Sequence, residues 1–344
     1  MKSKLVGFLV CMMLITTFLT TAINVENTDL KKLTQTEIVT TSFDDDVPIW
    51  KVGHKWIYKI KDINIDLEEN GSKAEQNKSF QVHLEIDELP LEVVDDTIDY
   101  DVEFKANLKG NYSVFIEEDN STIDIEGKLI GTTIKGNIFF NKSNLGIKKV
   151  DYKISGILTV KIKELPDDWN IPKILAAIPL PATITTTIDF DVPYTLLKFP
   201  LNASGYRWGL HGTNFTVNGK VQSIWLTILK FINDIATILD YPLLPEDIAA
   251  LLPVIDIKEA LETRGMDNTF EIPEVPSIFS CYSMDNITVP AGNFSAYNIS
   301  VAEILGKIYY APTAENIIKI AGQLGDLLPF MTSLEMELVE YELV

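Results

Sequence analysis

The sequence predicts a mainly β protein of the α+β class, in which a curved antiparallel sheet or half-barrel is covered by a helical insertion. Three observations support this fold class. Apolar and polar residues alternate with a period of two over most of 80–192, which is typical of strands with one buried face. The segment 223–264 instead has the period of amphipathic helices. Glycine recurs on the apolar face of the long strands, where it lets a sheet bend, at Gly110, Gly127, Gly136 and Gly156.

The N-terminal segment, residues 1–22, has the features of a secretory signal peptide. Lys2 and Lys4 precede an apolar run, and Thr20-Thr21-Ala22 offers small residues for cleavage. The run is near the lower length limit of a membrane-spanning helix, so an uncleaved membrane anchor is the alternative.

Two further regions follow this segment. Residues 23–47 are polar, lack an apolar period and contain Asp44-Asp45-Asp46, so they are expected to be a flexible polar tether. Residues 48–344 are then expected to form a single β-rich domain that carries the helical insertion.

The first strand of this domain is expected around Trp56, Tyr58 and Ile60, which share one face and are typical of core residues. The alternation then holds one apolar face from 98 to 116, and a strand of that length is expected to bend at Gly110.

Two phase shifts in the alternation predict further irregularities in the strands. The apolar phase slips by one near 130–133, which predicts a β-bulge there. A second slip occurs at Val339 in the last strand.

The segment 279–320 carries a series of hairpin signals. Pro290 and Gly292 predict a tight turn within 289–294, since proline fixes φ and glycine tolerates positive φ. A second turn is expected at 313–316. The first turn could instead be a binding loop, but the structural hairpin is the favoured interpretation.

The helical segment leaves two interpretations open. Its apolar residues could cover the open face of the sheet and complete the core, which is favoured. They could also form a lid over an apolar cavity that holds a lipid-like ligand. In the second case the expected ligand-binding residues are Trp225, Ile228, Phe231, Ile235 and Leu239.

N-glycosylation sequons are more frequent than the composition predicts by chance, which indicates a glycoprotein outside the cytoplasm. The ten acceptor residues are Asn70, Asn77, Asn111, Asn120, Asn141, Asn202, Asn214, Asn286, Asn293 and Asn298. The formal net charge of −20 argues against nucleic acid as a partner and against electrostatic docking on anionic lipid.

Few residues offer catalytic or metal-binding chemistry. Signal cleavage would leave Cys281 as the one cysteine, expected to be buried filler. His54, His83 and His211 lack ligand-spaced neighbours, so neither a metal nor another cofactor is expected. A pair of catalytic carboxylates is not excluded by the sequence, because 49 residues are acidic.

Four short motifs resemble those of uncharacterised secreted and surface proteins of prokaryotes, mainly archaea. They are Trp50-x-x-Gly53-x-x-Trp56-x-Tyr58, Phe199-Pro200-Leu201, Val289-Pro290-Ala291-Gly292-x-Phe294 and Tyr309-Tyr310-x-Pro312. Those proteins share a Val-Pro-Ala-Gly-x-Phe hairpin and a Tyr-Tyr-Ser-Pro-type strand end, where Ala311 stands for the small polar residue. More distantly, the layout is similar to the curved half-barrels of periplasmic lipoprotein carriers. The resemblance implies a fold but no catalysis.

These observations predict a non-enzymatic glycoprotein, secreted or on the extracellular face of the cell envelope, that binds an apolar, lipid-like ligand between sheet and helices. The first alternative is a structural or adhesive envelope protein without a small-molecule ligand. The second is a secreted hydrolase. An apolar pocket beside 225–231 would favour the lipid-binding hypothesis. A packed interior with an exposed apolar patch would favour the adhesive protein. Two facing carboxylates in a cleft would favour the hydrolase.

Overall fold

The computed structural model describes residues 46–70, 76–118, 121–164, 179–238, 253–262, 267–272, 274–302, 305–322 and 331–344. The strands are β1 (Lys55–Asn70), β2 (Gln76–Asp95), β3 (Tyr100–Glu118), β4 (Ser121–Phe140), β5 (Ile147–Glu164), β6 (Pro179–Tyr194), β7 (Tyr206–Leu210), β8 (Thr213–Ser223), β9 (Val254–Asp256), β10 (Thr269–Ile272), β11 (Val275–Val289), β12 (Gly292–Val301), β13 (Gly306–Ala311), β14 (Asn316–Gly322) and β15 (Met331–Glu342). The described helices are α2 (Ile224–Ile238), α4 (Ile257–Glu262) and the 3-10 turn η2 (Pro312–Ala314).

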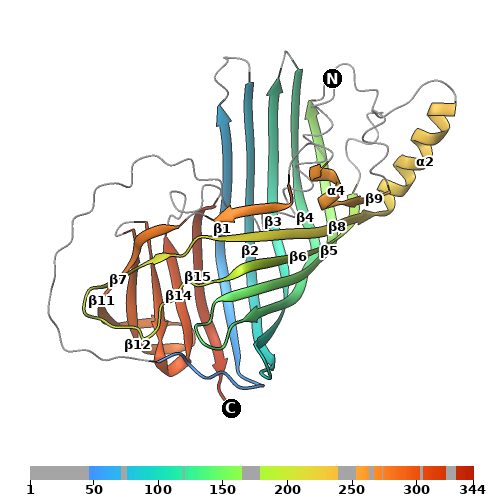
Figure 1. Ribbon diagram of the computed structural model, residues 1–344. Coiled ribbons are helices and arrows are strands. Elements are labelled where there is room, and N and C mark those ends of the chain that lie inside the picture. The colour runs from blue at the N-terminus through green and yellow to red at the C-terminus, as the bar shows by residue number, and fades with distance from the viewer. Residues whose placement is uncertain are drawn as a thin grey trace.

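The strands form one sheet, and the described strands pair with their neighbours in antiparallel orientation. Its order is β10-β8-β6-β5-β4-β3-β2-β1-β15-β14-β13-β12-β11-β7, and β9 pairs with β8. The sheet curves strongly, so that β6, β8 and β10 cross in front of β1 to β4 (Figure 1). The predicted mainly β fold with a curved antiparallel sheet is therefore confirmed.

The two ends of the sheet are joined by nearly continuous strands. β7 ends at Leu210 and β8 begins at Thr213, while β10 ends at Ile272 and β11 begins at Val275. β7 pairs with β11, and β8 pairs with β10. These two pairs therefore form one bent ribbon that connects the first and last strands of the sheet order.

The predicted irregularities lie where the alternation shifts phase. The pairing of β3 with β4 shifts between Leu108 and Gly110. The pairing of β4 with β5 shifts between Ile130 and Thr133, and Gly131 there has a φ of 55°. β1 skips Val339 of β15. The first two shifts belong to one bulge, because the extra residue lies in β4 and β3 keeps a single phase through Gly110. An extra residue reverses which side the next side chains face, so this bulge and the one at Val339 could be found from the sequence.

The inner face of the sheet is filled by side chains. The largest buried cluster joins residues of β1 to β6 with β8, β10 and α4, among them Leu84, Phe104, Ile154, Phe215 and Ile257. We call β1 to β4 one arm of the curved sheet, and β6, β8 and β10, which cross in front of them, the other arm. The core lies between these two arms.

A second core lies at the start of β1 and contains Trp56 and Tyr58, two of the residues predicted to share a buried face. Trp56 and Tyr58 are 0% and 2% exposed. The Trp56 Nε1 donates to the carbonyl of Ala314 at 2.7 Å, and the Tyr58 hydroxyl donates to the carbonyl of Ile317 at 2.8 Å. β1 therefore fixes the turn between β13 and β14, some 260 residues later in the chain.

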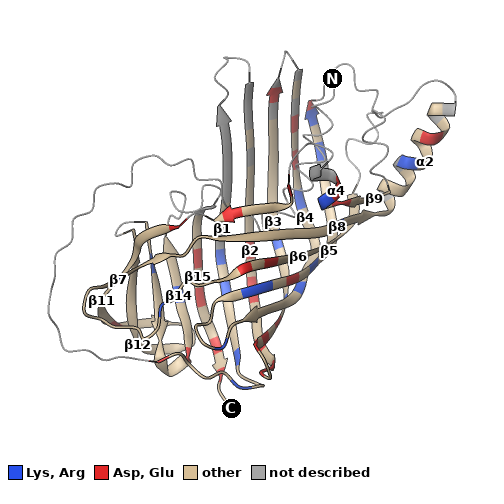
Figure 2. Ribbon diagram, viewed as in Figure 1, with Lys and Arg blue, Asp and Glu red and all other residues tan. Residues whose placement is uncertain are grey.

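Acidic and basic residues are interspersed along the strands (Figure 2), and most of those with described side chains are exposed or half-buried. Many of the lysines contact a carboxylate on a neighbouring strand. Lys161 and Lys163 lie 2.7 and 2.8 Å from Glu126, and these hydrogen bonds lower the pKa of that carboxyl to about 2. Lys61 contacts Glu337 at 2.6 Å.

The α2 helix differs from the expectation in its orientation. The predicted helix is present, but it extends beyond the margin of the sheet and does not lie over it (Figure 1). Ile224 and Phe231 on its apolar side are 64% and 65% exposed, whereas Asn233 is 3% exposed. The physical reason is the junction: β8 ends at Ser223 and α2 begins at the next residue, so no turn is available to fold the helix back.

The predicted signal peptide or anchor at 1–22 lies outside the described residues, as does the tether apart from its last two residues. In the portion of the chain that is described, no helix combines the length and apolar character needed to span a membrane.

Candidate binding grooves on the outer face of the sheet

The predicted ligand-binding residues of the helical segment are only partly placed. Phe231 and Ile235 are 65% and 43% exposed, and Ile228 is half-buried. Leu239 and the side chain of Trp225 lie outside the described structure. The described residues of this set therefore form an exposed apolar strip on α2 and do not face the inside of the sheet.

A groove of about 770 Å³ lies where the outer face of the sheet meets the base of α2. We call it the junction groove. β4, β5, β6, β8, β9 and α2 all contribute to its lining. The lining residues are Gly131, Thr133, Ser155, Gly156, Ile157, Pro181, Ala182, Thr183, Gln222, Ser223, Ile224, Thr227, Pro253 and Val254.

None of these lining side chains is charged, although the outer face around them is rich in charge. Ile157 and Val254 are 37% and 39% exposed, and Ile224 continues the same surface onto α2. The rest of the lining is mainly hydroxyl and amide groups. A groove of this size and composition suits an alkyl chain with a few hydrogen bonds at its border.

The bulge in β4 positions one wall of the junction groove. It turns Thr132 inward, where it is 3% exposed, and leaves Ile130 50% exposed. A Cβ at Gly156 would lie 2.2 Å from the Thr132 hydroxyl, so only glycine fits opposite the bulge. Ile157 then pairs with Ile130 in the β4–β5 ladder, which places two isoleucines side by side on the outer face.

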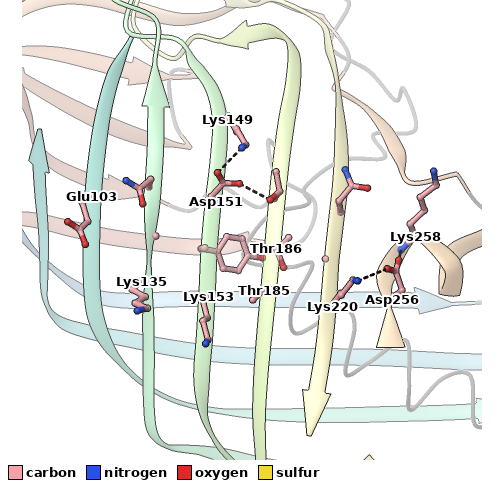
Figure 3. A pocket seen from close by; sticks show the side chains of 16 residues that line it. Glu103, Lys135, Lys149, Asp151, Lys153, Thr185, Thr186, Lys220, Asp256 and Lys258 are labelled. Atoms are coloured by element: carbon pink, nitrogen blue, oxygen red, sulfur yellow. Dashed lines mark hydrogen bonds and ion pairs between the residues drawn. The ribbon is translucent and has the colours of Figure 1, made fainter. Parts of the chain in front are cut away.

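A second groove of about 750 Å³ lies further along the same strands. We call it the lysine groove. Its charged lining consists of five lysines against three carboxylates, a local excess of positive charge in a chain with a net charge of −20. These residues are Lys135, Lys149, Lys153, Lys220, Lys258, Glu103, Asp151 and Asp256 (Figure 3).

The carboxylates at the lysine groove have structural partners. Asp151 is 2.8 Å from Lys149 and accepts a hydrogen bond from the Thr187 hydroxyl at 2.7 Å. The hydrogen bond to Asp151 raises the pKa of Lys149 above its ordinary value. Asp256 accepts a hydrogen bond from the backbone N–H of Lys258 at the start of α4. Asp151 and Asp256 are therefore held by contacts within the sheet and at the start of α4.

Lys135 and Lys153 face each other on adjacent strands, with no carboxylate between them. They are direct cross-strand neighbours in the β4–β5 ladder, and Lys105 of β3 is the next residue in the same row. Within the described parts of the chain, no ion pair or hydrogen bond is found for these three lysines. Figure 3 shows Lys135 and Lys153 side by side on the groove without a drawn contact. Like charges in this arrangement repel each other.

The remaining candidate residues are dispersed. Burial raises the pKa of the Cys281 thiol to about 11, so the predicted role as buried filler agrees with an unreactive, protonated group. His54 is buried beside Glu315, and His83 contacts Asn64 on the outer face. No group of three potential metal ligands occurs among the residues that the structure describes.

Among the sequon asparagines whose side chains the structure describes, none lines either groove. Asn111, Asn214, Asn286 and Asn293 are exposed. Asn298 is half-buried, and its Nδ2 donates to Asp285 at 2.7 Å. Asn141 and Asn202 are half-buried, while Asn120 and the side chains of Asn70 and Asn77 lie outside the described structure.

Sequence reasoning identified the strands that form both grooves but not the grooves themselves. Ile157 and Lys153 were each part of a regular alternation and carried no separate signal. The row of lysines could be recognised only from the strand register, because its neighbouring members are 30 and 18 residues apart along the chain.

A comparison of the chain with protein-family models, with curated proteins and with solved structures finds no match.

Proposed function

We propose that this chain is a non-enzymatic glycoprotein, secreted or held on the extracellular face of the cell envelope, that binds a lipid-like ligand in the junction groove. The observation that carries the proposal is an uncharged groove of about 770 Å³ at the place where sheet and helix meet. Binding pockets of proteins for small ligands have volumes of about 300–1,000 Å³, and the volume of this groove lies within that range.

Two further features support this proposal. The apolar side of α2 extends the surface of the groove, because Ile224 belongs to both and Phe231 follows two turns later. No sequon asparagine with a described side chain lines the groove, so none of these glycans would be attached inside it.

A second candidate function is adhesion within the cell envelope. The packed core between the arms and the exposed apolar side of α2, with Phe231 65% exposed, favour it. Exposed apolar surface of this kind marks sites where proteins or membranes bind. An adhesive protein would need no small ligand.

Native mass spectrometry of the protein from a glycosylating host tests the proposed function. We expect an extra mass beyond the glycans, which organic solvent removes and which is recovered as a lipid. Enzymatic deglycosylation is the control, because it removes the glycan mass and leaves the bound lipid. If glycans account for all of the added mass and added alkyl ligands do not bind, the proposed function is wrong, and adhesion becomes the better account.

A further inference from the structure

The junction groove and the lysine groove are consecutive parts of one outer face. On β4 and β5, Thr133 and Ser155 line the first groove, and Lys135 and Lys153 line the second. The same spacing of two residues separates the grooves on β6 and β8. Two residues of a strand span about 7 Å, so the lysines lie at the border of the uncharged groove.

The charge at this border is not balanced by a cross-strand carboxylate, unlike the charge of several other lysines on the described strands. Lys161 and Lys163 of β5 contact Glu126 of β4 at 2.7 and 2.8 Å. Lys319 contacts Glu337 at 2.8 Å. At the equivalent cross-strand position beside Lys153, β4 carries Lys135 instead of a carboxylate. An anion between the two ammonium groups would remove their repulsion.

From these positions we propose that the ligand of the junction groove is an anionic amphiphile, whose alkyl chain lies along Ile157 and whose phosphate or carboxylate headgroup contacts Lys135 and Lys153. The inference rests on the proposed function and names the ligand class. Ile157 and Lys153 are four residues apart on β5, a separation of about 13 Å, which a single alkyl chain can span. The net charge of −20 keeps extended anionic surfaces away, whereas a single headgroup meets only this local excess of lysine.

β5 also provides a matched control. Lys161 lies four residues after Ile157 on the same face, as Lys153 lies four residues before it. Lys161 contacts Glu126 at 2.7 Å, so its charge is already balanced. A headgroup that recognises unpaired lysines therefore distinguishes Lys153 from Lys161.

The test is a calorimetric titration with dodecyl phosphate and with dodecyl maltoside, both below their micelle concentrations, and with inorganic phosphate alone. We expect wild-type protein to bind dodecyl phosphate about tenfold more tightly than dodecyl maltoside, as two lysine contacts of about 0.5–1 kcal/mol each would give. The double variant Lys135→Gln/Lys153→Gln should lose this preference and still bind dodecyl maltoside. Lys161→Gln should keep it, and added salt should weaken dodecyl phosphate binding only.

The outcomes separate this inference from the proposed function. If neither alkyl ligand binds, the proposed function fails and this inference fails with it. If both bind equally well, or if Lys161→Gln has the larger effect, the headgroup assignment alone is overturned. If inorganic phosphate binds as tightly as dodecyl phosphate, the lysines form a site for a free anion and the amphiphile assignment is wrong. Circular dichroism of each variant establishes that its fold is retained.

Discussion

A Trp56→Ala protein is expected to lose about 3–5 kcal/mol of unfolding free energy, the cost typical of removing a large aromatic side chain from a packed core. Trp56 is 0% exposed, and its ring centroid lies 4.9 Å from that of Trp50. Its Nε1 also holds the carbonyl of Ala314 at 2.7 Å. The substitution therefore opens a cavity and leaves a buried carbonyl without its donor.

Chemical denaturation followed by circular dichroism measures this effect. Phe231→Ala is the matched control, because it removes a phenyl ring that is 65% exposed and should change stability by less than about 0.5 kcal/mol. Similar unfolding midpoints for Trp56→Ala and wild type would show that the contact between β1 and the η2 turn does not stabilise the fold.

An Ile157→Asp protein is expected to bind dodecyl maltoside at least about tenfold more weakly than wild type, since the apolar contact of a buried isoleucine contributes about 1.5–3 kcal/mol. Ile157 is 37% exposed in the junction groove beside Ile130. The new carboxylate must also lose water when an alkyl chain covers it, which adds to the loss. The same calorimetric titration measures the change.

Val192→Asp is the control for this variant. Val192 is an exposed apolar residue of β6, 50% accessible, and is not part of either groove. The Val192→Asp protein should bind dodecyl maltoside as tightly as wild type does. Equal affinities for Ile157→Asp and wild type would place the ligand elsewhere on the protein.

The strands and their irregularities could be predicted from the sequence because a period of two and its phase are local properties. The slip near Ile130 and the slip at Val339 each correspond to a shift in strand register. The shift opposite Gly110 belongs to the same bulge in β4 as the slip near Ile130. The hairpin at Pro290 and Gly292 was equally local, since Val289 pairs with Gly292 across it.

The four resemblance motifs meet in space, which no single motif could indicate. Trp50 and Trp56 donate hydrogen bonds to the residues after Pro312. The ring of Phe199 lies 5.5 Å from that of Tyr310. Phe294 packs in the same core as Trp56. These motif residues are therefore core and turn residues of this fold, while the family resemblance itself stays a prediction.

The grooves could not be predicted because they depend on the pairing of distant strands. Lys105, Lys135 and Lys153 each occupy an ordinary outward position, and only the register places them in one row. The direction of α2 relative to the sheet could not be predicted from the sequence either. Its apolar period predicted a buried face, but the direct junction of Ser223 with Ile224 leaves that face exposed.

The most direct test of ligand binding in the junction groove is photolabelling with an alkyl phosphate that carries a diazirine on its chain, followed by peptide mapping. The account predicts labelled peptides that contain Ile157, Pro181, Ile224 and Val254, and competition by dodecyl phosphate. Labelling confined to other surfaces, or labelling that the competitor does not reduce, would contradict it.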